Sequence, residues 1–276
     1  MKMIQQNSPV FQKKLLQMGH HAILELRRPC EESCPVKAIS VSEDRVASIN
    51  QQKCTSCGLC VVNCPFGAVV DASDLVHLER TIRSGEYPVH VVLAPAFVGQ
   101  FGRQVAPGQV KAALMKLGFT EVWEAALGAD KAITQEAEEY TERVHKGEQF
   151  MTSSCCSAYV ITFEELIVWF EYAGINLSKE QTLVMEGPSS FGRSFAKAGG
   201  VANALQNFMG EKAPPVYQIE GIANCLKALE QYAGKGEIGF MEGMACEGGC
   251  VGGPRTMIRR PLAERAVDEF AKSSNE

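Results

Sequence analysis

Four cysteines crowded into one short stretch are the first residues of this sequence that could do chemistry. They stand in the pattern C-x2-C-x2-C-x3-C-P, at Cys54, Cys57, Cys60 and Cys64. Two-residue gaps let a tight turn aim three thiolates at one iron–sulfur cubane, whereas the last cysteine, before the proline, ligates a neighbouring cluster. Structural zinc sites usually draw their ligands from separated pairs, so the spacing favours an iron–sulfur cluster over the zinc alternative.

A shorter copy of this run precedes it. Cys30 and Cys34 are followed by Pro35, and the flanking text PVKAI at 35–39 echoes PFGAV at 65–69. In bacterial ferredoxins two such runs exchange their last cysteines between clusters. The same exchange here completes one [4Fe–4S] cluster, with the ligands Cys34, Cys54, Cys57 and Cys60.

The second cluster of such a pair is incompletely specified. Cys30 and Cys64 are two of its ligands, but Leu24 and Arg27 occupy the places of the other two. The two cysteines are therefore either relics of a lost cluster or ligands of one that another side chain completes. The candidates for that side chain are His20, His21 or a more distant cysteine, although both histidines also fit the surface of a leading helix.

The remaining cysteines are Cys155, Cys156, Cys225, Cys246 and Cys250. Cys246 and Cys250 stand at positions i and i+4, which predicts that both lie on one face of a helical turn. The glycines around them would let the backbone approach a bulky inorganic ligand closely. Cys225 lies in a helical pattern, GIANCLKALE, and is predicted to be a core residue.

At these cysteines the sequence resembles the catalytic domain of [FeFe] hydrogenases, of the short monomeric type with an N-terminal ferredoxin-like 4Fe-4S module. The resemblance extends from about residue 27 to residue 254 and includes VVLAPAFVGQFG at 91–102 and EVWEAALGAD at 121–130. It implies an iron–sulfur oxidoreductase that catalyses 2H⁺ + 2e⁻ ⇌ H₂. The site implied is an H-cluster, a [4Fe–4S] cubane joined to a diiron subsite, which receives electrons from the N-terminal cluster.

The resemblance also implies roles for single cysteines. Cys156, Cys246 and Cys250 would hold the cubane of the H-cluster, and the Cys250 thiolate would also bridge to the diiron subsite. Cys155 would deliver protons to that subsite. Outside this context, adjacent cysteines such as Cys155 and Cys156 are often only small buried residues.

Further roles are implied away from the cysteines. Glu136 and Glu139, in ITQEAEEY, match the two carboxylates of the family's proton path, although the same pair is compatible with a solvated helix face. Ala94 and Pro95 would line the diiron pocket, and Met244 would pack beside it. Methionines in such positions are otherwise ordinary core residues.

One segment of the family pattern is absent. Family members carry a Pro-Cys-x-x-Lys motif, whose cysteine is the fourth cubane ligand and whose lysine binds a cyanide of the diiron subsite. In this sequence Ala158 leads directly into YVITFEE at 159–165, and the proton-path serine of the missing segment is absent too. Ser157 also stands where the family usually has proline.

Two functions of different class follow. The first is a hydrogenase that exchanges electrons with ferredoxin or another soluble carrier, and whose other reactants are protons and H₂. The second, kept open by the missing motif, is a non-catalytic relative that senses redox state or transfers electrons without a complete H-cluster.

Composition excludes some other classes. The chain has 276 residues, a formal net charge of −5 and 46% hydrophobic residues, so nucleic-acid binding through phosphates and disorder are both disfavoured. No signal peptide is evident, and the longest apolar runs, such as 89–98, are too short to span a membrane. We therefore expect a cytoplasmic protein, in whose reducing surroundings the eleven cysteines could bind metal.

These residues must be positioned by a mixed α/β chain. An amphipathic helix is predicted over 10–26, and residues 1–26 as a whole are assigned to this N-terminal helix. A ferredoxin-like α+β iron–sulfur module follows over 27–78, and an α/β domain of the iron-hydrogenase type, shortened after 158, over 88–276. Strands are expected at 89–93 (buried), 121–125, 216–219 and 237–241, and helices at 110–117, 129–144, 162–172, 194–208, 221–233 and 258–272.

Overall fold

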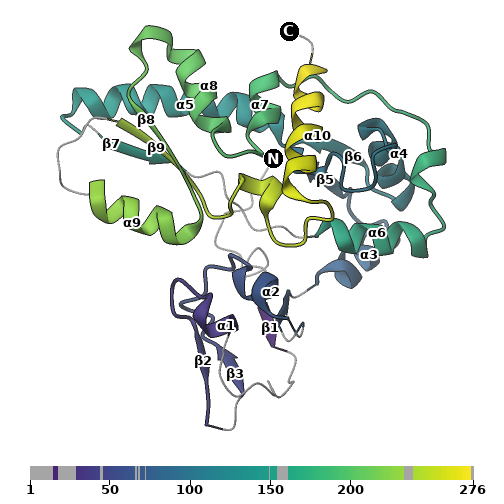
Figure 1. Ribbon diagram of the computed structural model, residues 1–276. Coiled ribbons are helices and arrows are strands. Elements are labelled where there is room, and N and C mark those ends of the chain that lie inside the picture. Colours follow the sequence, from purple (N-terminus) through teal and green to yellow (C-terminus); the bar gives the residue numbers. More distant parts are fainter. Residues whose placement is uncertain are drawn as a thin grey trace. The chain divides into compact units, whose positions relative to one another are not determined.

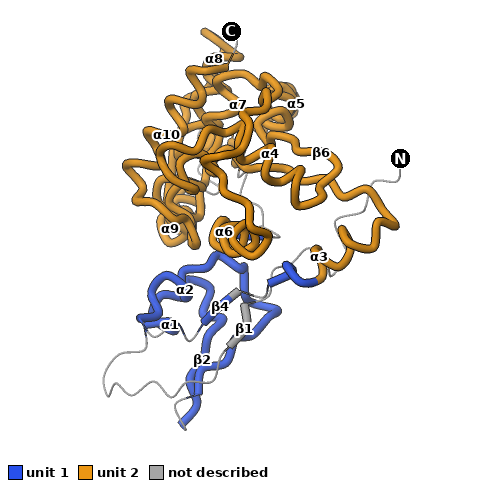
Figure 2. The backbone as a smooth tube through the Cα atoms, turned by 90° about the vertical axis from the view of Figure 1, so that its right-hand side faces the viewer, with its two compact units in different colours: residues 1–76, 157–162 blue, residues 77–156, 163–276 orange. Residues whose placement is uncertain are grey.

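Two units make up the chain in the computed structural model (Figure 2). Unit 1 contains residues 1–76 and 157–162, and unit 2 contains 77–156 and 163–276. The structure describes residues 15–17, 29–43, 46–65, 67, 69–71, 73–148, 150–153, 161–232 and 239–274. None of the helices in these ranges is long and apolar enough to cross a membrane.

Unit 1 consists of short strands and short helices. Its elements are β1 (Leu15–Gln17), α1 (Pro29–Glu32), β2 (Ile39–Val41), β3 (Ala47–Ile49), α2 (Leu59–Asn63) and β4 (Val69–Asp71). β1 pairs antiparallel with β4, and β2 pairs antiparallel with β3. A small apolar cluster of Ile39, Cys60 and Val69 forms its core, and other cysteines pack against it.

The helix predicted over 10–26 is wrong where the structure describes it. Leu15 and Leu16 are strand residues opposite Asp71 and Val70. Their helical spacing in the sequence is overridden because a ladder to a distant strand satisfies their backbone groups. The rest of 10–26 lies outside the described residues.

Unit 2 alternates helices and strands. After α3 (Leu75–Ser84), which crosses the unit boundary, come β5 (His90–Leu93), the 3₁₀ turn η2 (Pro95–Phe97), α4 (Pro107–Leu117), β6 (Glu121–Glu124), α5 (Ala126–His145), β7 (Phe150–Ser153), α6 (Phe163–Tyr172), η3 (Leu177–Lys179) and α7 (Ser190–Ser194). α8 (Gly200–Met209), η4 (Gly210–Lys212), β8 (Val216–Glu220), α9 (Ile222–Tyr232), β9 (Gly239–Met244), η5 (Gly249–Gly252) and α10 (Arg260–Lys272) complete it.

Both sheets of unit 2 are parallel. β5 pairs with β6, and β9 lies between β7 and β8 (Figure 1). Helices connect the paired strands, as parallel pairing requires. The core of the three-stranded sheet joins α5, α8 and the strands through residues such as Ile133, Leu205 and Phe240.

The strand predicted at 89–93 forms, but its predicted burial is wrong. Only Leu93 of β5 is buried, and the Val92 side chain is 63% exposed. Exposed His90 and Val92 alternate along β5 with Val91 and Leu93, so one face of the strand is left to solvent.

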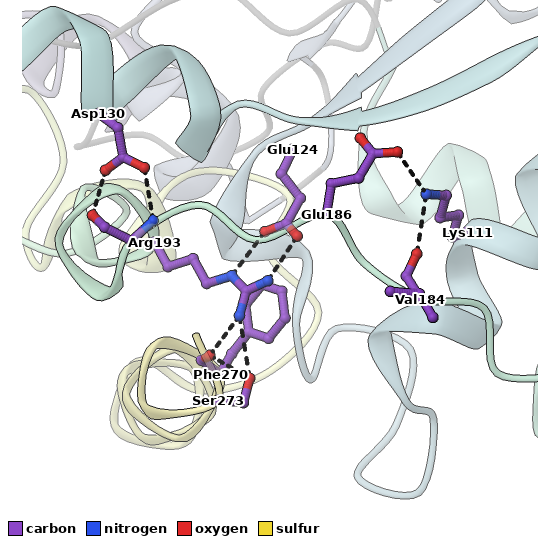
Figure 3. A network of polar contacts seen from close by, with 9 residues as sticks. Lys111, Glu124, Asp130, Val184, Glu186, Arg193, Phe270 and Ser273 are labelled. Atoms are coloured by element: carbon purple, nitrogen blue, oxygen red, sulfur yellow. Dashed lines mark hydrogen bonds and ion pairs between the residues drawn. The ribbon is translucent and has the colours of Figure 1, made fainter. Parts of the chain in front are cut away.

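A buried ion pair ties the elements of unit 2 together (Figure 3). Arg193, on α7, donates two hydrogen bonds to the Glu124 carboxylate at 3.0 and 2.9 Å. It also donates to the Phe270 carbonyl and stacks over the Phe270 ring. Burial raises the pKa of Glu124 despite the opposing effect of Arg193. The pair therefore connects β6, α7 and α10 through side chains that are almost fully buried.

Candidate iron–sulfur sites

The cysteines predicted to hold the first cluster surround one cavity in unit 1. Cys34, Cys54, Cys57 and Cys60 all line it, and Ile39, Ile49 and Leu59 form apolar parts of its wall. Among the described residues, no three metal-ligating side chains converge on a point that suits a single ion. Four thiols around one small hollow form a ligand set of the kind that holds a [4Fe–4S] cluster.

The local backbone directs donors at these sulfurs. The Ala38 amide donates a hydrogen bond to Cys34 Sγ at 3.1 Å, and the Ser56 amide donates to Cys54 Sγ at 3.4 Å. Ser56 reaches this position with a left-handed φ of 55°. Hydrogen bonds to ligand sulfurs are one of the means by which a protein sets the potential of a cluster.

Burial keeps the Cys60 thiol protonated when no metal is bound. It raises the pKa of Cys60 to about 11, and the neighbouring thiols Cys57 and Cys54 contribute in the same direction. A thiolate is the ligand form, so metal binding must release protons from this cavity. The positive charge of iron stabilises the buried thiolates, which the apolar wall does not.

The two cysteines left over by this set lie close to each other. Cys30 is on α1, Cys64 caps the C-terminal end of α2, and the two helices are in contact. The pKa of Cys30 is raised by burial and, to a smaller extent, by Cys64. The positions of Leu24 and Arg27, and those of His20 and His21, lie outside the described residues, so the second cluster stays a prediction.

In unit 2 the pair Cys246 and Cys250 lies on a tight loop. The prediction of a helical turn is wrong for Cys246: it follows β9 in a bend, and only Cys250 is in the 3₁₀ turn η5. The Gly249 amide closes the loop by donating to the Cys246 carbonyl at 3.1 Å. Glycines at 248 and 249 impose this path because both have left-handed φ angles, 86° and 80°.

Contacts from three directions fix this loop. Ala198 N–H donates to the Gly248 carbonyl at 3.1 Å, and Val251 N–H donates to the Ala196 carbonyl at 3.2 Å. Glu220, at the end of β8, accepts the Gly248 amide and pairs with Arg260 of α10. The glycines that the sequence associates with an inorganic ligand thus first serve protein packing, because a Cβ on Gly249 would lie 2.8 Å from Ala198 N.

The other pocket residues implied by the resemblance lie at strand ends. Ala94 follows β5 and Pro95 begins η2, and Met244 is the last residue of β9 and is buried. η2 and η5 both pack against α10. Gln100, just beyond η2, accepts the Met257 amide at 2.7 Å and so links the segment of Pro95 to the chain after the cysteine loop.

The two glutamates of the implied proton path occupy different surroundings on α5. Glu139 is exposed and pairs with Arg143 at 2.7 Å. Glu136 is half-buried, and burial raises its pKa, with a smaller contribution from Glu139. Its Oε1 accepts a 2.5 Å hydrogen bond from Ser153 Oγ. Its Oε2 is buried and has no hydrogen-bond partner among the described residues.

Sequence reasoning missed Ser153. The serine ends β7 two residues before Cys155, and its register partner on β9 is Glu242. Glu242 is itself buried, and its carboxylate accepts the Ala202 amide at 3.1 Å at the start of α8. Cys155 and Cys156 lie outside the described residues, so their roles stay predictions.

The structure gives Cys225 an ordinary environment. Its side chain is half-buried on α9, and its Sγ lies 3.6 and 3.5 Å from the carbonyl oxygens of Ile219 and Met244, to either of which the thiol can donate. Burial raises its pKa. A thiol held in this way packs β8, β9 and α9 together.

Known sequence families match most of the chain. The model described as iron only hydrogenase large subunit, C-terminal domain, matches residues 87–160 and 157–254, and the LdpA Fe-S cluster-binding domain matches 24–75. The two hydrogenase stretches meet where the sequence lacks the Pro-Cys-x-x-Lys segment. An uncharacterized ferredoxin of Methanocaldococcus jannaschii is 48% identical over 42 residues, which are 15% of this chain and 25% of that protein.

Two curated hydrogenases are similar over part of their length. The NADP-reducing hydrogenase subunit HndD of Solidesulfovibrio fructosivorans is 34% identical over 125 residues, 40% of this chain and 21% of that protein. Iron hydrogenase 1 of Clostridium pasteurianum is 32% identical over 105 residues, 35% of this chain and 18% of that protein. The aligned part is therefore about a fifth of these relatives.

Solved structures show the same fold. A variant of [FeFe]-hydrogenase HydA1 from Chlamydomonas reinhardtii aligns with a TM-score of 0.55 at 16% identity, over 74% of this chain and 91% of that one. A structure reporting stepwise H-cluster assembly in HydA(deltaEFG) also aligns with a TM-score of 0.55, at 15% identity, over 74% and 91%.

Proposed function

Because the chain belongs to the family of the iron-only hydrogenase large subunit, C-terminal domain, we propose that it is an iron–sulfur oxidoreductase that interconverts protons and H₂. In this proposal a soluble carrier such as a ferredoxin exchanges electrons with a [4Fe–4S] cluster in unit 1. Cys34, Cys54, Cys57 and Cys60 hold that cluster, which supplies one-electron transfer. The thiol-lined cavity with its amide donors supports this part of the proposal.

The observation that carries the hydrogenase assignment is the fixed loop of Cys246 and Cys250. A metal site needs ligands that surrounding contacts hold in place. Here backbone hydrogen bonds and the Glu220–Arg260 pair are the contacts that hold the cysteine loop. Cys156 would be the third cubane ligand. When bound, the H-cluster supplies the bond-making chemistry between protons and electrons.

The chain's own contribution is proton movement toward that site. Glu139 is open to solvent, Glu136 is half-buried, and Ser153 bonds to Glu136. We assign Ser153 the role of the hydroxyl between Glu136 and the thiol of Cys155. It accepts a proton from one side while it donates its own to the other, so no charge is left on the serine.

A specific observation favours the second candidate, an electron-transfer or redox-sensing relative. The sequence offers three of the four cubane thiolates and no lysine in place of the cyanide anchor. In the catalytic case the diiron subsite must therefore be held without that lysine, with the Cys250 thiolate as its protein anchor.

One experiment separates the two candidates. The protein is purified without oxygen, reconstituted with iron, sulfide and the diiron cofactor, and examined by infrared spectroscopy and by H₂ evolution from a reduced dye. The hydrogenase assignment predicts CO and CN⁻ stretching bands and H₂ formation, both lost in Cys250→Ser and retained in the control Cys225→Ser. Iron and sulfide bound without these bands or H₂ would establish the second candidate.

A further inference from the structure

A large cavity in unit 2 lies apart from the residues assigned above. It has a volume of about 850 Å³ and is bounded by the chain after η2, the segment 182–185 and one face of α10. Of the assigned residues that the structure describes, Ala94, Pro95, Glu136, Met244, Cys246 and Cys250 do not line it. Its size lies within the range of about 300–1,000 Å³ typical of small-molecule sites.

The wall formed by 182–185 is held in place by α4. Leu183 N–H donates to the Gly108 carbonyl at 3.2 Å, and Lys111 Nζ donates to the Val184 carbonyl at 3.1 Å. Gln109 Nε2 donates to the Glu180 carbonyl at 3.0 Å just before this wall. Figure 1 shows this part of the chain running beside α4 on its way from α6 to α7.

The opposite wall is equally fixed. Phe270 of α10 packs edge-on against Phe97 with ring centroids 5.7 Å apart, and Arg193 donates to the Phe270 carbonyl. A Cβ on Gly99 would lie 3.1 Å from Ala266 Cβ, so α10 and the chain after η2 are in close contact. Because both walls are anchored, the cavity exists before any ligand arrives, which lowers the entropic cost of binding.

The surface of the cavity is apolar inside and cationic at the edge. Val98, Val105, Leu183, Leu262 and Phe270 supply apolar lining, and Arg103 and Arg265 supply exposed guanidinium groups. Neither guanidinium forms an ion pair with a described residue. Arg193 also reaches the lining, but Glu124 already neutralises its charge. Glu269 is the one carboxylate of the lining, so positive charge is in excess.

From this arrangement we propose that the cavity binds one amphipathic organic anion, with its apolar body against Leu262 and Phe270 and its head group at Arg103 and Arg265. The planar guanidinium fork matches the oxygens of a carboxylate or a phosphate. The apolar lining binds the apolar body of the ligand, because burying apolar surface is the main driving force for binding such ligands. The site is independent of the proposed hydrogenase activity.

Isothermal titration calorimetry on the full, cluster-containing chain tests the proposal with three probes of one chain length, decanoate, decyl phosphate and uncharged decanol. We expect one molecule per chain and at least about tenfold tighter binding of a charged probe than of decanol, a difference of about 1.4 kcal/mol. If decanoate binds more tightly, the head group is a carboxylate, and if decyl phosphate binds more tightly, it is a phosphate. Raising the salt concentration should weaken both charged probes.

Matched variants locate the site. Arg103→Gln and Arg265→Gln should each weaken the charged probe about tenfold, whereas Arg259→Gln, an exposed arginine outside the cavity, should not. Val105→Trp fills the space and should abolish binding of all three probes. Equal affinity for the three probes, several molecules per chain, or the same loss in Arg259→Gln would overturn the proposal.

Discussion

The Glu136 carboxylate has two oxygens in different situations, one bonded to Ser153 and one buried without a described partner. An acid in that state can accept or release a proton with little rearrangement. We therefore predict that Glu136→Gln lowers H₂ evolution by about 100-fold or more, the usual contribution of a general acid or base. Ser153→Ala should lower it as well, and Ser153→Thr should restore it.

The H₂-evolution assay of these variants needs control substitutions nearby that leave the proposed proton path unchanged. Glu138→Gln changes an exposed neighbour on α5, and Thr152→Ala changes the exposed face of β7. Both should retain the activity and the iron content of the unmodified protein. Full activity in Glu136→Gln would show that protons take another route.

A pH dependence follows from the raised pKa of Glu136. The folded chain binds this proton more tightly than the unfolded chain, so the free energy of unfolding falls as the pH rises from the ordinary carboxyl pKa to the raised one. Glu136→Gln should flatten this decrease, and Ser153→Ala should extend it to higher pH because a bond that lowers the pKa is lost. Denaturant unfolding across pH 4–8 measures the free energy of unfolding at each pH, with Glu138→Gln as the control.

At the scale of elements, the Cys246–Cys250 loop depends on Gly249. An alanine there would have to hold a left-handed φ of 80° with its Cβ within 3 Å of the 196–198 backbone. The left-handed strain alone costs about 1–2 kcal/mol, and the clash adds to it. We predict that Gly249→Ala lowers the melting temperature and the iron bound by the chain, as measured by calorimetry and iron analysis.

Gly128 provides the matched control. It lies within α5, and a Cβ there would meet nothing within 4 Å. Gly128→Ala should therefore stabilise the helix by about 0.5–1 kcal/mol and leave the iron content unchanged. An iron content in Gly249→Ala equal to that of Gly128→Ala would show that the loop tolerates another path.

Elements with local signals could be predicted from the sequence, and those set by distant contacts could not. The strand at 121–125 and the helix at 129–144 have their own periodicity, and the structure has β6 and α5 there. The strand Leu15–Gln17 depends on pairing with Val69–Asp71, which no local pattern reveals. The spacing of Cys54, Cys57 and Cys60 predicted a shared site, but the amides of Ala38 and Ser56 that face the sulfurs depend on loop geometry.

The proposed proton path shows the same division. Glu136 and Glu139 match the family pattern, whereas Ser153 depends on the contact between β7 and α5, because Ser153 and Glu136 are 17 residues apart in sequence. A polar residue at the end of a strand just before functional cysteines is a signal that could have suggested it.

At the scale of the whole molecule, Arg193 and Glu124 form an ion pair whose side chains are 3% and 2% exposed. Removing one partner leaves a buried charge alone, which typically costs about 3–5 kcal/mol. We predict a loss of that size in Arg193→Met. The double variant Arg193→Met/Glu124→Leu should recover much of it, because an apolar pair can replace a buried ion pair.

Denaturant unfolding of the single and double variants measures both effects. Surface pairs such as Arg143–Glu139 serve as the comparison, since Arg143→Met should lower the free energy of unfolding far less than Arg193→Met. A double variant no more stable than Arg193→Met would mean that the hydrogen bonds to Phe270 and Ser273 carry the stability instead.

Unit 1 should respond to loss of its cluster far more than unit 2. Its apolar cluster contains Ile39, Cys60 and Val69, with other cysteines packed against it, so metal binding and folding are coupled there. After oxidative removal of iron and chelation, we expect rapid hydrogen exchange at β2 and β3. The strands β7, β9 and β8 should stay protected, as mass spectrometry would show. Protected β2 and β3 in the iron-free protein would contradict this.

The overlap between ligands and core in unit 1 also bears on how the protein is made and removed. A newly synthesised chain would complete this unit only after iron and sulfide reach Cys34, Cys54, Cys57 and Cys60, so cofactor supply would set the pace of maturation. A chain stripped of iron by oxygen would open at the same place and expose its backbone to proteases. The lifetime of the polypeptide in the cell would then follow the lifetime of its cluster.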